Sequence, residues 1–312
     1  MSDRILVLYY PDDITLFHTL YPLVTTRRFR GLFRFTTDLD AVLHGSPENK
    51  LLIFRFFKRR DVAQDGTALQ RIRDNYHKIV YFDDAASADD LNVAAFSYVD
   101  AYFKKQLYRD RSLYLRPMYG KRLHADYYHR RYGVTDTNEA IRPPLKEEWL
   151  SKFRIGWNLG IGCYPKSKTR NRIGRRLYPF LGSGLLRPIY RRPQLRPTKP
   201  NDREPLVSAR YSRRFDRETV AYHRTIYDTV VKPHPEFLSE KVPLRAYNRE
   251  LQQLKAVFSP FGWGEICFRD FEAFSNGAVL LKPSMHHLET WPDMYRDGET
   301  YLSVDWDSTD LQ

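Results

Sequence analysis

The stretch FSPFGWGEICFRDFEAFSNGAVLLKP, residues 258–283, decides the fold of this chain. The apolar residues 256–259 predict a short strand, a glycine-rich turn follows, and residues 265–275 have the apolar spacing of a helix. Gly277 lies where a glycine C-cap is expected, and the run AVLL at 278–281 predicts a buried strand. Strand, turn, helix and strand in this order predict a βαβ unit with a parallel sheet.

The turn and the start of this helix together predict an anion site. Gly262 and Gly264 allow a backbone to come close to a ligand. The first N–H groups of the helix and the positive end of its dipole point at the turn. Glu265, Arg269 and Glu272 have the spacing that puts them on one helix face. An arginine and two carboxylates suit a nucleotide sugar, because arginine can meet a pyrophosphate and a carboxylate can accept bonds from hydroxyl groups. An ordinary surface pair between Glu265 and Arg269 is the alternative.

The same segment resembles the donor-binding half of GT-B glycosyltransferases, in particular the exostosin-like and bacterial family 1 transferases. The pattern in those enzymes is Ser-x-x-Gly-x-Gly-Glu, a helix with Arg and a later Glu, and then Gly-Ala/Cys-Val-x-Val/Leu-x-x-Pro. The matching residues here are Ser259, Gly262, Gly264, Glu265, Arg269, Glu272, Ala273, Gly277, Val279 and Pro283. The resemblance covers residues 205–305. It implies a metal-independent transferase that moves a sugar from a nucleotide-sugar donor to a hydroxyl acceptor, a surface glycan or a lipid-linked saccharide. No cofactor is expected, because the nucleotide sugar is a co-substrate.

The resemblance also implies roles for single residues. Glu272 would bind the ribose of the donor, and Arg269, with the backbone at Gly264 and Glu265, would lie near the pyrophosphate or the sugar. Arg269 is also a catalytic candidate, because a cation there stabilises the leaving diphosphate. Other donor-binding candidates are the basic residues that such enzymes aim at the diphosphate, here Arg210, Arg213, Arg214, Lys255 and Lys282.

The first hundred residues have a βαβ rhythm of their own. Apolar runs predict strands at 4–10, 50–57 and 79–82, and a helix is expected at 68–77. No GxGxxG or GxxxxGK[ST] motif follows these strands, which argues against a Rossmann dehydrogenase or a P-loop enzyme.

Asp83 and Asp84 follow the strand at 79–82, at the edge where a parallel sheet presents its functional loops. One of them is a candidate general base that deprotonates the acceptor hydroxyl. A capping or turn aspartate is the alternative.

The remaining elements are assigned from apolar spacing. Beyond residue 200, a strand is expected at 205–210 and helices at 218–231 and 247–255. Further helices are expected at 99–107, within 141–150 after a proline turn, and starting at 308–312. No metal site is predicted, because His286 and His287 have no cysteine or carboxylate at ligand spacing.

Composition limits the partners. The 312 residues carry a formal charge of +13, which favours polyanionic partners. No apolar run is long enough for a transmembrane helix, and two cysteines, Cys163 and Cys267, form no disulfide framework. We therefore expect a cytoplasmic protein, with a peripheral position on the inner face of the membrane as a further expectation.

The segment 166–200 contains many basic and no acidic residues, with apolar residues interleaved. It is interpreted either as a solvated linker or as a segment that docks on an anionic membrane. Nucleic-acid binding is the weakest interpretation, because no RNA- or DNA-binding motif accompanies the segment.

These observations predict an α/β protein of GT-B type, with two Rossmann-like domains facing across a cleft and a C-terminal domain that is either truncated or unusually short for such a fold. The expected domains are 1–165 on the acceptor side, the basic segment 166–200, and the donor-binding domain 201–312. The competing hypothesis is a non-catalytic basic protein that binds membrane or nucleic acid and has a GT-B-like fold.

Overall fold

The computed structural model describes residues 4–12, 14–29, 31–54, 66–162, 199–212 and 214–311, together with residues 169, 172–174 and 176–177. The chain forms two compact units. Unit 1 contains Met1–Ala85, Leu91–Gln106 and Leu145–Pro193, and unit 2 contains Ala86–Asp90, Leu107–Pro144 and Gln194–Gln312. The division therefore differs from the expected domain boundary, because the segments 86–90 and 107–144 belong to unit 2.

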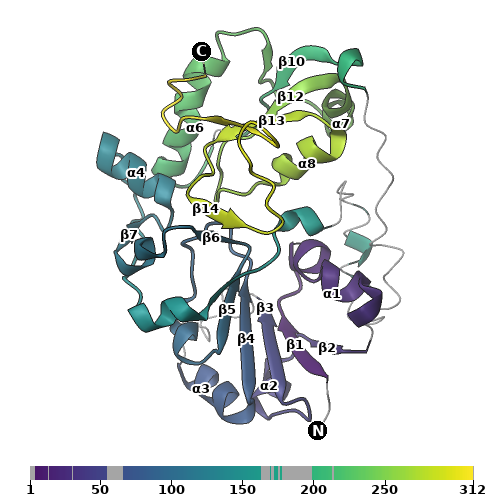
Figure 1. The fold of residues 1–312 in the computed structure, drawn as a ribbon, viewed down its shortest axis with the longest axis vertical. Coiled ribbons are helices and arrows are strands. Elements are labelled where there is room, and N and C mark those ends of the chain that lie inside the picture. The colour runs from purple at the N-terminus through teal and green to yellow at the C-terminus, as the bar shows by residue number, and fades with distance from the viewer. Residues whose placement is uncertain are drawn as a thin grey trace. The chain divides into compact units, whose positions relative to one another are not determined.

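Unit 1 is built on a six-stranded parallel sheet with the order β2-β1-β3-β4-β5-β9 (Figure 1). Its strands are β1 Ile5–Tyr9, β2 Phe33–Thr36, β3 Lys50–Phe54, β4 Lys78–Asp83, β5 Ala101–Lys104 and β9 Phe153–Ile155. Its α-helices are α1 Tyr21–Thr25, α2 Leu39–Leu43 and α3 Gly66–Asn75. A π-helical turn spans Thr15–Thr19, and 3-10 turns span Arg27–Phe29, Val93–Ser97, Glu147–Lys152 and Leu159–Ile161.

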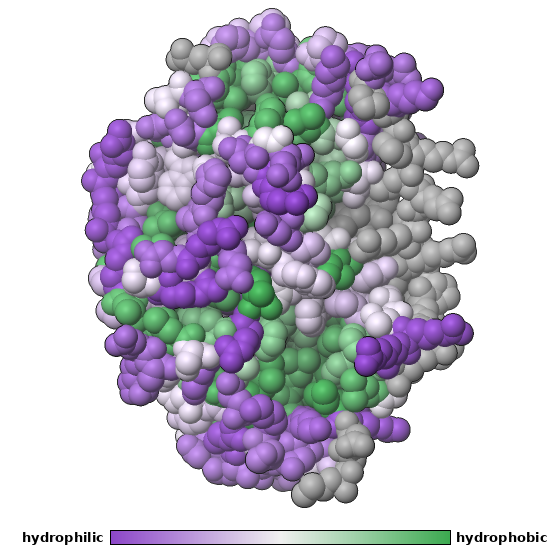
Figure 2. Space-filling view, viewed as in Figure 1, coloured by the Kyte–Doolittle hydropathy of each residue, from purple (hydrophilic) through white to green (hydrophobic). Residues whose placement is uncertain are grey.

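The core of unit 1 follows from the alternation of its strands. Val7, Tyr9, Phe54 and Phe82 point to one face and pack with Leu16, Phe17, Leu20, Leu23 and Val24 from the turn and helix after β1. Around this cluster, Phe33, Phe35, Leu52, Phe103 and Trp157 are only partly buried. On the face shown in Figure 2, hydrophobic residues gather in the lower part, where Figure 1 draws the strands of this sheet.

Unit 2 is built on a five-stranded parallel sheet with the order β11-β10-β12-β13-β15. The strands are β10 Glu204–Ser208, β11 Phe237–Leu238, β12 Leu254–Phe258, β13 Val279–Pro283 and β15 Leu302–Val304. In chain order the sheet reads 2-1-3-4-5, an arrangement whose ligands bind beyond the carboxyl ends of the strands, where the chain reverses its direction of winding. The α-helices of the unit are α4 Leu123–Tyr132, α6 Glu218–Val231, α7 Leu244–Gln253 and α8 Phe268–Asn276.

Shorter elements complete the chain. They are the strands β6 Gln106–Tyr108, β7 Met118–Tyr119, β8 Ile141–Arg142 and β14 Leu288–Thr290, and the 3-10 turns Arg111–Leu115 and Pro200–Asp202. β7 and β8 pair antiparallel. None of the helices in the described part of the chain has the length and apolarity needed to cross a bilayer.

The predicted α/β class with parallel sheets is confirmed, and both sheets are compatible with Rossmann-like domains. The helix at 218–231 is confirmed in its full length, and Gly277 ends α8 in the left-handed region with a φ of 70°. The helix expected at 247–255 is found as Leu244–Gln253, so Lys255 belongs to β12.

Three helix predictions are wrong. Residues 99–107 form β5 and the start of β6, because β5 pairs with β4 on one side and β9 on the other, and this tertiary pairing overrides the local apolar spacing. Within 141–150 the chain forms the short strand β8 and the start of the 3-10 turn Glu147–Lys152, and it turns at Ser308, whose φ is 63°. The helix expected to start at Glu265 starts at Phe268 instead.

Candidate functional site

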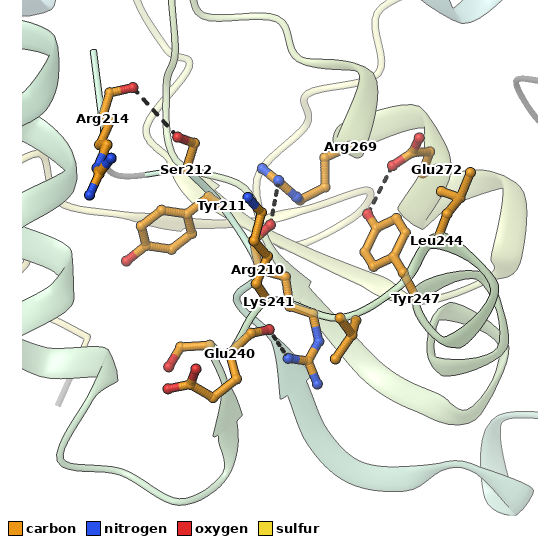
Figure 3. Close-up of a pocket in the computed structure, with 12 residues that line it drawn as sticks. Arg210, Tyr211, Ser212, Arg214, Glu240, Lys241, Leu244, Tyr247, Arg269 and Glu272 are labelled. Atoms are coloured by element: carbon orange, nitrogen blue, oxygen red, sulfur yellow. Dashed lines mark hydrogen bonds between the residues drawn. The ribbon is translucent and has the colours of Figure 1, made fainter. Parts of the chain in front are cut away.

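A cavity of about 560 Å³ opens at the carboxyl ends of β10 and β11 in unit 2 (Figure 3). Its walls come from the loop after β10, the loop after β11, the start of α7 and one face of α8. The lining residues are Arg210, Tyr211, Ser212, Arg214, Ser239, Glu240, Lys241, Val242, Leu244, Tyr247, Arg269 and Glu272. This is the edge of the sheet at which the strand order predicts a ligand site.

Arg269 and Glu272 lie one turn apart on α8 and both face this cavity. The guanidinium of Arg269 donates from Nη2 to the carbonyl of Arg210 at 2.8 Å. Its Nε is buried and has no hydrogen-bond partner among the described residues. The carboxylate of Glu272 accepts a hydrogen bond from the Tyr247 hydroxyl at 2.8 Å, which Figure 3 shows. Burial and the charge of Glu272 raise the pKa of Tyr247, so this hydroxyl stays a donor at neutral pH.

Arg210 has a structural partner of its own. Its Nε donates to both carboxylate oxygens of Glu250, at 2.9 and 2.7 Å, and its Nη2 lies 2.7 Å from Oε2. Such a fork-to-carboxylate arrangement is a strong, directional interaction. Its charge is therefore balanced, and Arg210 holds the loop after β10 against α7.

The cavity has further cations that are less constrained. Arg214 and Lys241 are exposed and line the cavity, and neither forms an ion pair with another described residue. Arg213, which sequence analysis placed with them, lies outside the described residues. Arg269, Arg214 and Lys241 can therefore supply positive charge to an anionic ligand, while Glu272 and Tyr247 can meet hydroxyl groups.

The glycine-rich turn does not line the cavity. A Cβ placed on Gly264 would lie 1.8 Å from the carbonyl oxygen of Ala86, so the absence of a side chain allows two backbones to approach. Glu265 is fully buried and accepts bonds from the Ser87 hydroxyl and the Ala88 N–H, both at 3.2 Å. The prediction that Glu265 shares a helix face with Arg269 is wrong, since Glu265 precedes α8 and fixes segment 86–90. A Cβ on Gly262 would likewise meet protein, the Arg224 guanidinium at 3.1 Å.

Lys282 is also absent from the cavity. Its ammonium is fully buried and lies 3.1 Å from the carboxylate of Asp270. Asp270 also accepts from the Ser259 hydroxyl at 2.6 Å, the Tyr295 hydroxyl at 2.7 Å and the N–H of Cys267 at 3.0 Å. Because Asp270 caps the first turn of α8, the protein's own carboxylate occupies the helix end that was predicted to attract a ligand anion.

Lys255 lies at the amino ends of the strands, on the side of the sheet opposite the cavity. It is exposed near the amino end of β12, whereas the cavity lies beyond the carboxyl ends of the parallel strands. Lys255 therefore does not share a site with Arg269.

Asp83 is the last residue of β4 and Asp84 follows it, and both lie in unit 1. Asp83 accepts from the Tyr102 hydroxyl at 2.6 Å and from the Ala85 N–H at 2.8 Å, and its Oδ2 lies 3.5 Å from the buried ammonium of Lys104. These contacts stabilise the anionic form and weaken Asp83 as a base. Asp84 is buried and accepts from the Thr19 hydroxyl at 2.7 Å. The contacts of Asp83 thus favour the structural alternative for that residue, and the Thr19 contact shows that Asp84 too has a partner within the protein.

A further group in unit 2, here called the histidine cluster, contains His124, His223 and His287 around Phe261. The Phe261 N–H donates to Nε2 of His223 at 2.9 Å, so in this arrangement Nδ1 carries the proton and faces the Tyr128 hydroxyl at 2.7 Å. Burial lowers the pKa of all three imidazoles, that of His287 to about 3, and they are neutral at pH 7. The described residues contain no group of three or more His, Cys, Asp or Glu side chains arranged to hold a metal ion.

Sequence reasoning missed Tyr247, Lys241 and Asp270. Tyr247 and Lys241 come from the segment between β11 and α7, which contains no motif, so only the tertiary structure brings them to α8. Asp270 had a usable signal, because it is three residues after Cys267, at the spacing of a capping box.

No protein-family model and no curated protein matches this chain.

Proposed function

We propose that this chain is a glycosyltransferase whose unit 2 binds a nucleotide-sugar donor in the cavity beside α8. The observation that carries the proposal is that Arg269 and Glu272 line one cavity beyond the carboxyl ends of the strands of a 2-1-3-4-5 parallel sheet. A cavity of about 560 Å³ is within the ordinary range for a small-molecule site.

The proposed chemistry is displacement at the anomeric carbon. The acceptor oxygen forms a bond to that carbon, the bond from the carbon to the diphosphate oxygen breaks, and the electron pair leaves with the diphosphate. Arg269, Arg214 and Lys241 stabilise the charge that develops on the leaving group. Glu272 and the Tyr247 hydroxyl hold a ribose or sugar hydroxyl, and the proton of the attacking hydroxyl passes to a carboxylate base.

Calorimetry with uridine, guanosine and adenosine diphosphates tests the binding step. We expect Glu272→Gln to weaken the binding of the preferred nucleotide by about 10- to 100-fold, the cost of losing a hydrogen bond to a charged group. Arg269→Gln is expected to lower turnover by two to three decades, roughly the value of one leaving-group donor. Arg249→Gln is the matched control, because Arg249 is an exposed arginine of α7 that does not line the cavity.

Hydrolysis of a nucleotide sugar, followed in the same protein, separates catalysis from binding alone. Nucleotide binding without hydrolysis or transfer would favour the non-catalytic alternative. Unchanged affinity in both Glu272→Gln and Arg269→Gln would remove the cavity from consideration as the donor site.

A further inference from the structure

A second surface of unit 2 has the composition of a ligand site. Two cavities, of about 490 and 560 Å³, share Tyr127, Arg131 and Trp306 as lining residues. The first lies at the carboxyl ends of β13 and β15 and is also lined by His287, Asp305 and Asp307. The second extends along α4. We call this surface the Trp306 groove.

Trp306 is held in a defined orientation. Its indole N–H donates to the carbonyl of Ser284 at 3.1 Å, and its own carbonyl accepts from the Tyr128 hydroxyl. The rings of Tyr127 and His287 contact Trp306 at centroid distances of 5.3 and 5.1 Å, with interplanar angles of 87° and 84°. Among the described aromatic rings none lies stacked parallel on Trp306, and its side chain is partly exposed. Phe261 is a third perpendicular neighbour, at 5.9 Å and 80°, and the exposed part of the indole is the surface that a ligand can contact.

The polar groups of the groove mix donors and acceptors at close range. Asp305 and Asp307 each accept a bond from the Thr309 hydroxyl, at 3.1 and 3.0 Å, and keep further acceptor capacity. Arg131 lies 4.0 Å from Asp307, too far for a tight pair, and can donate to a ligand. Nε2 of His287 is buried without a hydrogen-bond partner among the described residues. Burial keeps this imidazole neutral by lowering its pKa to about 3.

We propose that the Trp306 groove binds a saccharide. The axial C–H groups of a pyranose ring carry partial positive charge and suit the negative face of an indole. Hydroxyl groups both donate and accept, which matches carboxylates, a guanidinium and a neutral imidazole around one cavity. Two carboxylates in the first cavity disfavour a phosphate group there, and the adjoining second cavity gives room for a further sugar ring. If the chain is a transferase as proposed above, this groove holds the acceptor glycan; the binding of saccharide itself does not depend on that proposal.

Direct binding of oligosaccharides in the absence of nucleotide tests this inference. The probes are neutral glucose and mannose hexasaccharides and a uronic-acid hexasaccharide, titrated into the full chain by calorimetry or saturation-transfer NMR. We expect at least one probe to bind, and we expect Tyr127→Ala and Trp306→Ala each to weaken that probe by about tenfold. Preference for the uronic-acid probe would indicate that the carboxylate of an acidic sugar contacts Arg131. Preference for a neutral probe would indicate that ring and hydroxyl contacts suffice for binding.

The matched control is Trp291→Ala, which removes another exposed tryptophan that does not line the groove. Since Trp306→Ala could affect folding, Asp307→Asn provides a second, conservative variant, and thermal unfolding monitors all variants. Binding of no probe, or binding unchanged in Tyr127→Ala, Trp306→Ala and Asp307→Asn, would overturn the inference. Nucleotide affinity measured in the same variants keeps this outcome separate from the proposed donor site, since Tyr127, Trp306 and Asp307 do not line the cavity beside α8.

Discussion

Replacement of Lys282 by methionine tests whether this lysine stabilises the fold or binds a ligand. Methionine keeps most of the apolar stem but removes the ammonium that lies 3.1 Å from the Asp270 carboxylate. Both side chains are fully buried, so the variant leaves an anion in the core of unit 2 without its cation.

The expected magnitude follows from what remains around Asp270. Removal of one partner of a buried ion pair costs about 3–5 kcal/mol. Three donors stay in place, namely the Ser259 and Tyr295 hydroxyls and the Cys267 N–H, so the lower end of that range, about 3 kcal/mol, is expected. The double replacement Lys282→Met with Asp270→Asn removes both charges and should recover part of the loss, which gives a positive coupling between the two sites.

Urea unfolding at pH 7, followed by circular dichroism, measures the change in the free energy of unfolding. Lys255→Met is the control, because Lys255 is exposed at the far edge of the sheet and should change stability by less than about 0.5 kcal/mol. The affinity of folded Lys282→Met for nucleoside diphosphates should equal that of the unaltered chain. A variant that keeps its stability within about 1 kcal/mol but loses nucleotide binding would refute this interpretation and restore Lys282 as a donor ligand.

Two further perturbations test the interior of unit 2. Burial lowers the folded-state pKa of each imidazole in the histidine cluster below the ordinary value of 6.5. The unfolded chain therefore takes up protons first, and the folded state loses stability as the pH falls below about 6.5. For His287, whose pKa is lowered to about 3, the loss at pH 5 is about 2 kcal/mol. Unfolding measured at pH 5 and pH 7 checks this, and equal stability at both would contradict it. Gly264→Ala should lower the free energy of unfolding by about 3 kcal/mol or more, the upper end of the usual cost of overpacking, because the new Cβ would lie 1.8 Å from a backbone oxygen. An unchanged urea midpoint would show that segment 86–90 can move aside without cost.

The sequence predicted the parallel sheets because buried parallel strands are short apolar runs, and the runs at β1, β3, β4, β12 and β13 are of this kind. The longest helix, α6, was also predicted, and its residues Tyr227 and Val231 pack with residues of the sheet of its own unit. Residues 99–107 were misassigned because they contain the charged residue Lys104, which is not typical of a buried strand. Its partner, Asp83, comes from β4, and nothing near Lys104 in the sequence indicates this ion pair. Helical spacing over so few residues does not outweigh pairing with two neighbouring strands.

The sequence named some of the residues that line the candidate cavity, but it placed the site at the glycine-rich turn, which does not line that cavity. Arg269 and Glu272 were identified from helix periodicity, which is a local property, and the structure brings both to one cavity. The partners of Glu265 and Lys282 are set by tertiary contacts with residues 87–88 and with Asp270, and spacing along the chain carries no information about them. A glycine or a buried charge therefore has the same appearance in the sequence whether it approaches a ligand or another part of the protein.

The capping of α8 changes how an anionic ligand would be held in this protein. A free helix end would contribute backbone N–H groups and about half a positive charge to a phosphate. Here the Asp270 carboxylate accepts the N–H of Cys267 at the start of α8, and Lys282 balances the charge of Asp270 in the core. The amino end of α8 therefore has little net attraction left for an anionic ligand. Positive charge at the cavity then comes from side chains, of which Arg269 is held by the carbonyl of Arg210 and Lys241 is exposed. Recognition of a diphosphate would thus depend on the conformation of the loops after β10 and β11 rather than on the glycine-rich turn.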